Sequence, residues 1–166
     1  MSTTLTTSVP VHPGSRLVTL RPLLRTHAGF APTIARVTLG LVILPHGAQK
    51  TLGWFGGYGF TGTMHWFTET MQIPWILGFA AILAETLGGL ALLVGFASRI
   101  AALGVGAIFV VAAATLHAQH GFFMNWFGNQ KGEGVEYFVL GLALVAIVAV
   151  RGGGSLSVDR ALSRNH

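Results

Sequence analysis

Residues 74–99 read PWILGFAAILAETLGGLALLVGFASR, an apolar run in which Glu85 is the only acidic residue. About 20 apolar residues in an α-helix cross the hydrocarbon core of a bilayer, which is roughly 30 Å thick. The run therefore predicts a transmembrane helix over 74–96. The next run, 100–116, contains no charge, and it predicts a second helix over 98–120. The turn between them is so short that the two helices should form an antiparallel hairpin.

Two further spans are shorter or more polar. The first apolar stretch runs into LPHGAQKTLGW (44–54), which holds a proline, a histidine, a glutamine and a lysine. The last apolar stretch, 137–150, has only 14 residues, so it needs the turn that begins at Glu133 to cross the bilayer. Predicted helices over 33–52 and 133–150 complete a four-transmembrane-helix bundle, and the expected fold class is an all-α membrane protein.

The composition supports this fold class. Of 166 residues, 52% are hydrophobic and 9% are charged, whereas about a quarter of the residues of a soluble domain are charged. Four spans of about 20 residues use nearly the whole chain, which leaves no room for a soluble enzyme module. Cysteine is absent, so dithiol relays, thiolate metal sites, iron–sulfur clusters and cysteine nucleophiles are excluded within this chain.

The distribution of cations predicts the orientation in the membrane. With both termini cytoplasmic, eight of the ten lysines and arginines lie inside and only Lys50 and Lys131 lie outside, as the positive-inside rule favours. Residues 1–29 are then expected to form a disordered cytoplasmic tail, with an Arg-rich transit peptide as the alternative. Residues 30–152 form the transmembrane domain and 153–166 a cytoplasmic C-terminal tail. The net charge of +5 indicates attraction to anionic lipid, and no nucleic-acid footprint is recognisable.

Aromatic residues gather on the predicted extracytoplasmic side. All four tryptophans lie there, whereas the aromatic belts of membrane proteins normally form at both interfaces. The segments GWFGGYGFTGT (53–63) and GFFMNWFGN (121–129) therefore predict an aromatic, Gly-rich extracytoplasmic lid over the mouth of the bundle. Such a lid would cover a flat hydrophobic ligand such as a quinone. The alternative is a re-entrant plug that only packs and anchors.

Glu85 is the strongest candidate for a functional residue. It sits at the middle of its predicted helix, and its face of the helix is built from small residues that let another helix approach closely. A carboxylate at this depth must be paired or neutral. The candidate partners on the other helices are His46, Gln49, Lys50, His117, His120, Glu133 and Glu136.

A shared polar cavity in the outer half of the bundle explains these residues best, because each costs a few kcal/mol at membrane depth unless it pairs or faces water. Glu85 and His117 are the candidates for proton handling. The i,i+3 spacing of His117 and His120 also allows joint metal ligation, although no third ligand is defined. The expected ligand-binding set is His46, Gln49, Lys50, Glu85, His117, His120 and Glu136, with Trp54 and Trp126 from the lid.

A purely structural role is the alternative for the same residues. Lys50 and Glu136 are close enough to the interface for their charged ends to reach water, and the two histidines would serve as caps at headgroup level. Glu85 would then only pair with a neighbour to fix helix packing.

Four motifs in order resemble those of the DoxX family of four-helix bacterial inner-membrane proteins. They are R36-x3-G40-x5-H46-G47-x2-K50, AETLGGLALLVGFASRIAA (84–102), HAQHGFF (117–123) and SLSVD (155–159). The resemblance implies recurring polar positions at Arg36, His46, Lys50, Glu85, Arg99 and His117, but it transfers no catalytic role.

The resemblance also implies a function in membrane redox chemistry, because the family includes the type of membrane subunit associated with thiosulfate:quinone oxidoreductase. One expectation is quinone-linked oxidation of a small reduced substrate, or membrane redox homeostasis, with electrons from a redox partner protein. The alternative is a non-catalytic membrane scaffold that recruits partner enzymes. The expected partners are the lipid bilayer and either a redox partner protein or further copies of the chain. A transporter is a third interpretation, although inverted repeats are not visible.

Overall fold

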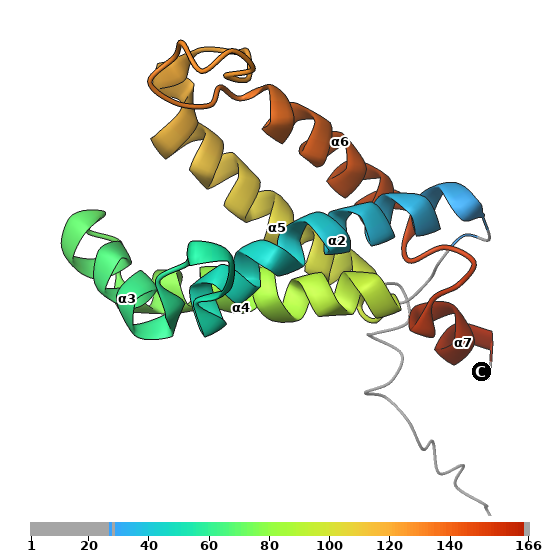
Figure 1. Ribbon diagram of the computed structural model, residues 1–166. Coiled ribbons are helices and arrows are strands. Elements are labelled where there is room, and N and C mark those ends of the chain that lie inside the picture. Colours follow the sequence, from blue (N-terminus) through green and yellow to red (C-terminus); the bar gives the residue numbers. More distant parts are fainter. Residues whose placement is uncertain (1–26, 28, 165–166) are drawn as a thin grey trace, which may run out of the picture.

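The computed structural model describes residue 27 and residues 29–164, and within these residues the regular elements are all helical. Four long helices form the frame: α2 (Phe30–Leu52), α4 (Trp75–Val94), α5 (Ser98–Ala112) and α6 (Glu136–Arg151). α2 lies along α4, and α5 and α6 form a second pair that leans away from the first at one end (Figure 1). Shorter elements complete the chain: η1 (Trp54–Gly56), α3 (Gly59–His65), η2 (Trp66–Thr70), η3 (Ala113–His117), η4 (Ala118–His120) and α7 (Val158–Arg164).

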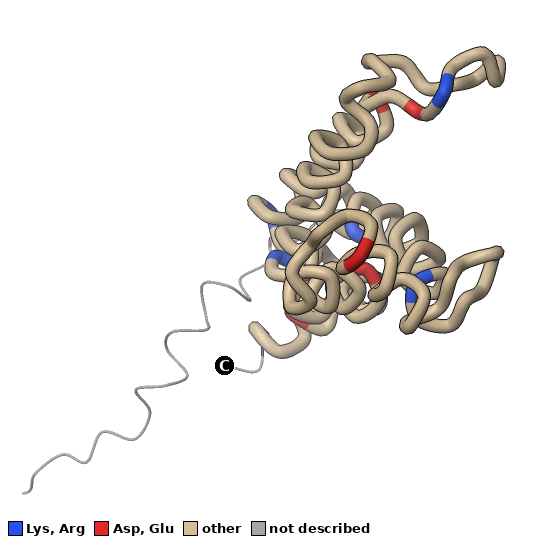
Figure 2. Tube along the Cα trace, turned by 90° about the vertical axis from the view of Figure 1, so that its left-hand side faces the viewer, with Lys and Arg blue, Asp and Glu red and all other residues tan. Residues whose placement is uncertain are grey.

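Among the described residues, three helical runs are long and apolar enough to cross a membrane: α2, α4 and the continuous run Ser98–His120 formed by α5, η3 and η4. Large apolar side chains point outward from them, such as Leu41, which is 61% exposed, and Leu103, which is 58% exposed. Long stretches of the helices carry neither positive nor negative side chains (Figure 2). Side chains of this kind are suited to contact with lipid, so the protein is an all-α integral membrane protein.

α6 is shorter than the sequence predicts. It has 16 residues and begins at Glu136, so the prediction that helix four includes Glu133 is wrong. The residues before it are held by the preceding loop, because the N–H groups of Gly134 and Glu136 donate to the carbonyls of Phe123 and Phe122. At 1.5 Å per residue α6 is about 24 Å long. That is less than the thickness of the hydrocarbon core, and the fourth span therefore stays a prediction.

Glycines bring the backbones of α2 and α4 into contact. A Cβ atom on Gly47 would lie 2.8 Å from the Cα atom of Thr86, and one on Gly89 would lie 3.2 Å from the Cα atom of Leu44. These separations leave no room for a side chain at Gly47 and little room at Gly89, as in small-residue interfaces between membrane helices. The close approach fixes the register of α2 against the middle of α4, next to Glu85.

The segment after α6 folds back onto the bundle and is held by Arg36. This side chain is 2% exposed, and its guanidinium donates from Nε to the carbonyl of Gly153, at 2.7 Å, and from Nη2 to the carbonyl of Leu156. Its Nη1 donates to the carbonyls of Leu92 and Leu93, at 2.7 and 2.6 Å. These two carbonyls belong to the last turn of α4, where no intrahelical donor is available. One arginine on α2 therefore joins α4 to the segment that follows α6.

Asp159, at the start of α7, stabilises the same end of the bundle. It is 1% exposed, and its two carboxylate oxygens accept hydrogen bonds from the N–H groups of Ala97 and Ser98, at 2.7 and 2.9 Å. Ala97 has a φ of 46°, a left-handed conformation in the tight turn between α4 and α5. Asp159 thus caps the N-terminus of α5 from a distant part of the sequence.

These contacts make part of the predicted C-terminal tail a component of the bundle. Gly152, Gly153 and Gly154 are buried, and α7 packs against the α4–α5 turn through Asp159. The cytoplasmic location of this segment stays a prediction. The predicted disordered tail at 1–29 lies almost entirely outside the described residues.

Candidate functional site

A cavity of about 390 Å³ lies between the α2–α4 pair and the α5–α6 pair. It is in the half of the molecule where Figure 1 shows the two pairs leaning apart. Phe109 and Phe138 contribute aromatic walls and Ile43 and Ile108 contribute aliphatic ones. The polar and ionisable residues that line it are His46, Lys50, Glu85, His117, Glu133 and Tyr137.

Lys50 and Glu85 form an ion pair at the edge of this cavity. The Nζ atom of Lys50 lies 2.5 Å from Oε2 of Glu85, and the two side chains are 24% and 7% exposed. The sequence left Lys50 and the histidines as possible partners of this carboxylate. The structure selects Lys50 because Gly47 brings α2 against the residue next to Glu85, and Lys50 follows Gly47 by one helical turn on the same face.

His117 approaches the cavity from the other pair of helices. It ends the π-helical turn η3, a wider turn that is frequent at functional sites. Its Nδ1 atom lies 2.9 Å from the carbonyl oxygen of Glu133, and its ring centroid lies 4.6 Å from that of Phe138. A carbonyl can only accept, so Nδ1 carries the proton and Nε2 of the neutral ring is an acceptor. His117 is therefore held in the tautomer that can take up a proton at Nε2.

Tyr137 is a cavity residue that the sequence analysis missed. It lies in the first turn of α6, with its ring centroid 5.9 Å from that of Phe109 and 5.7 Å from that of Phe138. Sequence reasoning counted it as the first residue of a short apolar span. A tyrosine directly after Glu136, at the start of a predicted transmembrane helix, was the available signal, since buried tyrosine hydroxyls normally need a polar partner.

Of the predicted ligand-binding residues, His46, Lys50, Glu85 and His117 line the cavity. Gln49, His120, Glu136, Trp54 and Trp126 are not among its lining residues. Gln49 donates to the carbonyl of Phe55, Glu136 accepts from the N–H of Met124, and the ring of His120 packs against Gly132. Trp54 and Trp126 are exposed.

The predicted metal site gains no third ligand from the structure. Within residues 27 and 29–164, no group of three histidine, aspartate or glutamate side chains is placed to hold a metal ion. His117 lines the cavity, whereas His120 packs against the loop. Metal ligation by the His117–His120 pair stays a prediction.

The two aromatic segments do not meet as a single lid in this structure. Residues 53–63 lie beside the α2–α4 pair, and residues 121–129 form the connection between α5 and α6 at the end of the other pair (Figure 1). In the described part of the chain no ring contact joins them. Trp54 pairs with Phe55 and Phe122 with Phe123 within their segments, and Phe60 pairs with Phe79 of α4. The second segment reaches the cavity through Met124.

Comparisons with known proteins agree with the resemblance noted in the sequence. The DoxX family model matches residues 31–118, which include α2 except its first residue, α4, α5 and the cavity residues His46, Lys50, Glu85 and His117. Inner membrane protein YqjF of Escherichia coli (strain K12) is 28% identical over 131 residues, which cover 79% of this chain and 91% of that protein. No solved structure matches the chain significantly. Because the family model covers more than half of the chain, including the helices that carry the ion pair, the protein belongs to the DoxX family.

Proposed function

We propose that this protein is a component of a redox system in the bacterial inner membrane, and that its cavity binds a quinone ring or a small reduced substrate. The observation that carries the proposal is the Lys50–Glu85 pair at the wall of a cavity of about 390 Å³ that His117 also lines. Placing an ionisable residue within a membrane span costs free energy, so a set of such residues beside a cavity favours a functional role. The name of the similar protein from Escherichia coli supports the inner-membrane location.

The size and walls of the cavity suit a flat ring. A volume of about 390 Å³ lies at the lower end of the range of about 300–1,000 Å³ that is usual for small-molecule sites. Phe109, Tyr137 and Phe138 offer ring faces and edges against which an aromatic or quinonoid ring would stack. Lys50 offers a hydrogen-bond donor for an oxygen of the ligand.

The ionisable residues would handle the protons of the reaction. Reduction of a quinone to a quinol takes up two electrons and two protons. The chain has no cysteine, so it cannot pass electrons through a dithiol of its own, and in this proposal they come from the reduced substrate or a redox partner protein. Glu85 and Nε2 of His117 would accept and deliver protons at the ligand.

The test is ligand binding by the full-length protein in a mild detergent, with decylubiquinone and menadione as probes. Glu85→Gln and His117→Gln should each weaken binding or quinone-linked turnover by about tenfold or more, as expected for a lost hydrogen bond or proton-transfer group in a binding site. His120→Gln, outside the cavity lining, is the matched control and should behave as the parent protein. Thermal stability is measured beside binding, because Glu85→Gln also leaves Lys50 without its partner.

A non-catalytic scaffold is the second candidate, and one observation favours it. Phe123, Trp126 and Phe127 are 67%, 78% and 90% exposed on the α5–α6 connection, where they offer an aromatic surface to a partner protein. If neither quinone binds and a partner protein co-purifies through this connection, the scaffold function replaces the redox one. Loss of that partner in Trp126→Ser, with retention in Trp54→Ser, would identify the surface.

A further inference from the structure

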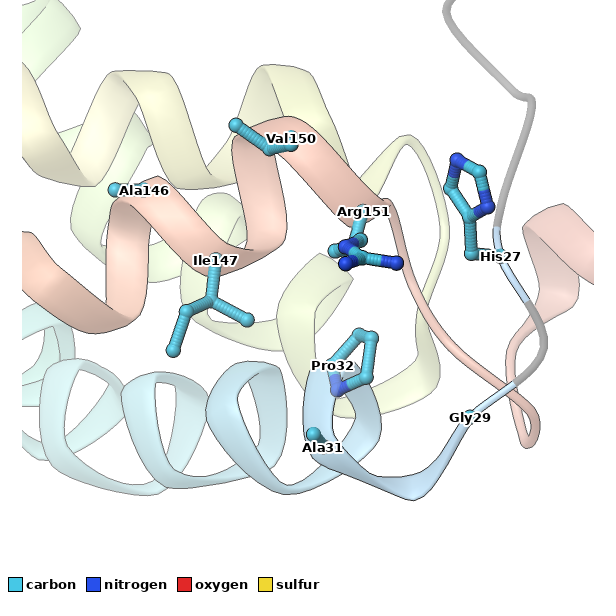
Figure 3. Close-up of a pocket in the computed structure, with 8 residues that line it drawn as sticks. All are labelled: His27, Gly29, Ala31, Pro32, Ala146, Ile147, Val150 and Arg151. Carbon is cyan, nitrogen blue, oxygen red and sulfur yellow. The ribbon is translucent and has the colours of Figure 1, made fainter.

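A second cavity lies at the opposite end of the molecule from the Lys50–Glu85 pair. It has a volume of about 560 Å³ and occupies the groove between the start of α2 and the end of α6. It shares no lining residue with the first cavity. Its lining includes Pro32 of α2, Ala146, Ile147, Val150 and Arg151 of α6, and His27 (Figure 3).

The groove is apolar along its length and basic at one end. Val150 is 66% exposed and Ile147 is 39% exposed, so this part of the α6 face is open to lipid. In Figure 3 the guanidinium of Arg151 lies between the end of α6 and Pro32, with the ring of His27 beyond it. The backbone N–H of His27 donates to the carbonyl of Arg151 at 2.9 Å, which fixes the two basic residues side by side.

The first turn of α2 adds a further positive contribution at the same place. Gly29 and Pro32 both line the groove, and the first turn of α2 contains no acidic residue. The N-terminus of a helix carries partial positive charge, which adds to the attraction of Arg151 for an anion.

The wider surroundings are also basic. At this end the described residues include five arginines, at positions 36, 99, 151, 160 and 164, and one acidic residue, Asp159. Asp159 is buried and accepts hydrogen bonds from the N–H groups of Ala97 and Ser98, so its carboxylate is directed at the α5 N-terminus. Basic pockets between membrane helices attract lipids with anionic headgroups.

We infer that this groove is a binding site for one anionic phospholipid, with an acyl chain between α2 and α6 and the phosphate held by Arg151 and His27. An apolar channel that ends in two basic residues matches a molecule with an acyl chain and a phosphate, and it does not match a soluble anion. The site is independent of the proposed redox function, and it would tie the start of α2 to the end of α6 through the lipid.

The test uses the full-length protein in dodecyl maltoside and measures lipid retention by native mass spectrometry together with thermal stability. The probes are phosphatidylglycerol, phosphatidylcholine with the same acyl chains, and inorganic phosphate. Phosphatidylglycerol should bind more tightly than phosphatidylcholine, by about fivefold for the charge of Arg151 at the headgroup. Phosphate alone should neither stabilise the protein nor displace phosphatidylglycerol.

Two pairs of variants separate the headgroup from the chain. Arg151→Gln should reduce the preference for phosphatidylglycerol by about fivefold, whereas Arg164→Gln, which removes the same charge at the same end, should leave it unchanged. Ala146→Phe fills the groove without altering charge and should weaken binding of both lipids, whereas Ala143→Phe, an exposed α6 position outside the groove, should not. Arg151→Lys keeps the charge and should retain most of the preference.

Equal binding of the two phospholipids by the parent protein would overturn the proposal. So would full competition by inorganic phosphate, or unchanged phosphatidylglycerol binding in both Arg151→Gln and Ala146→Phe. If Arg151→Gln fails to fold, the test rests on two other results. Arg151→Lys should keep most of the preference for phosphatidylglycerol, and Ala146→Phe should weaken lipid binding relative to Ala143→Phe.

Discussion

The ammonium group of Lys50 lies 2.5 Å from the carboxylate of Glu85, where α2 and α4 are close enough for their backbones to touch. The pair therefore joins the end of one membrane helix to the middle of another. Glu85 is nearly buried and Lys50 is 24% exposed, so the lysine retains some contact with its surroundings and the carboxylate retains little. Removing Lys50 and removing Glu85 should therefore lower the stability of the protein by unequal amounts.

This inequality can be measured by a double-mutant cycle. Lys50→Met should cost more stability than Glu85→Gln, roughly 2–4 against 1–2 kcal/mol, because it leaves the more buried charge without a partner. The double variant should cost less than the sum of the two, by about 1–3 kcal/mol. Unfolding in a detergent titration provides the measurement, with Gln49→Met as the control. Additive costs would show that the pair contributes no coupling energy.

Asp159 offers a second test, at the other end of the bundle. Asp159→Ala removes the acceptor of two backbone hydrogen bonds and the negative charge near Arg36, and it should lower the free energy of unfolding by about 2–3 kcal/mol. Asp159→Asn keeps one acceptor oxygen and should cost about half as much. Ser163→Ala, at an exposed position of α7, should stay within about 0.5 kcal/mol of the parent. A thermal melt of Asp159→Ala that matches the parent would rule out the cap.

The contact between α2 and α4 predicts opposite effects for two glycines. Gly47→Ala places a Cβ atom 2.8 Å from the backbone of Thr86, so the helices must separate, at a cost of about 1–3 kcal/mol. Gly88→Ala meets its nearest neighbour at 3.8 Å, and it should be neutral or stabilising by up to about 1 kcal/mol, because alanine is the better helix former. Melting temperatures of both variants, measured in the same detergent, give the comparison. A tolerated Gly47→Ala would contradict the close approach of the two helices.

The orientation predicted from the arginines can be tested with single cysteines, because the chain has none of its own. In intact spheroplasts, Asn129→Cys should react with a membrane-impermeant maleimide, and Ser163→Cys should react only after lysis. This result also requires α6 to span the membrane, since the two positions lie on either side of it. The reverse labelling pattern would show that the protein has the opposite orientation in the membrane. Equal labelling of both positions would show that α6 does not span the membrane.

The sequence predicted the helices well because their boundaries depend on local composition. Hydropathy placed the helix around Glu85 at 74–96, and the structure has α4 at Trp75–Val94. The cost of a charge in the membrane also identified Glu85 as a residue that needs a partner. The choice of Lys50 among the candidates depended on how closely α2 and α4 approach, and that distance follows from the tertiary packing at Gly47.

Tyr137 and Asp159 show where sequence reasoning was insufficient. Asp159 caps Ser98 across 61 residues, and no periodicity in either segment indicates such a contact. Tyr137 lines the cavity from the first turn of α6, with its ring against Phe109 of α5, and the local sequence gives no sign of this neighbour. The roles of both residues depend on contacts between segments that lie far apart in the sequence.

The hydrogen bonds by which Arg36 joins α2 to the segment after α6 can form only late in biosynthesis. Two of its hydrogen-bond acceptors, the carbonyls of Gly153 and Leu156, lie 117 and 120 residues further along the chain. At a translation rate of about 5–20 residues per second, the arginine waits roughly 6–25 s before those partners leave the ribosome. During this interval a guanidinium on the first membrane helix has only water, headgroups or the end of α4 to satisfy it. The bundle therefore reaches its final form only after the segment that follows α6 has been synthesised, and until then the Arg36 end of α2 is best held at the membrane surface.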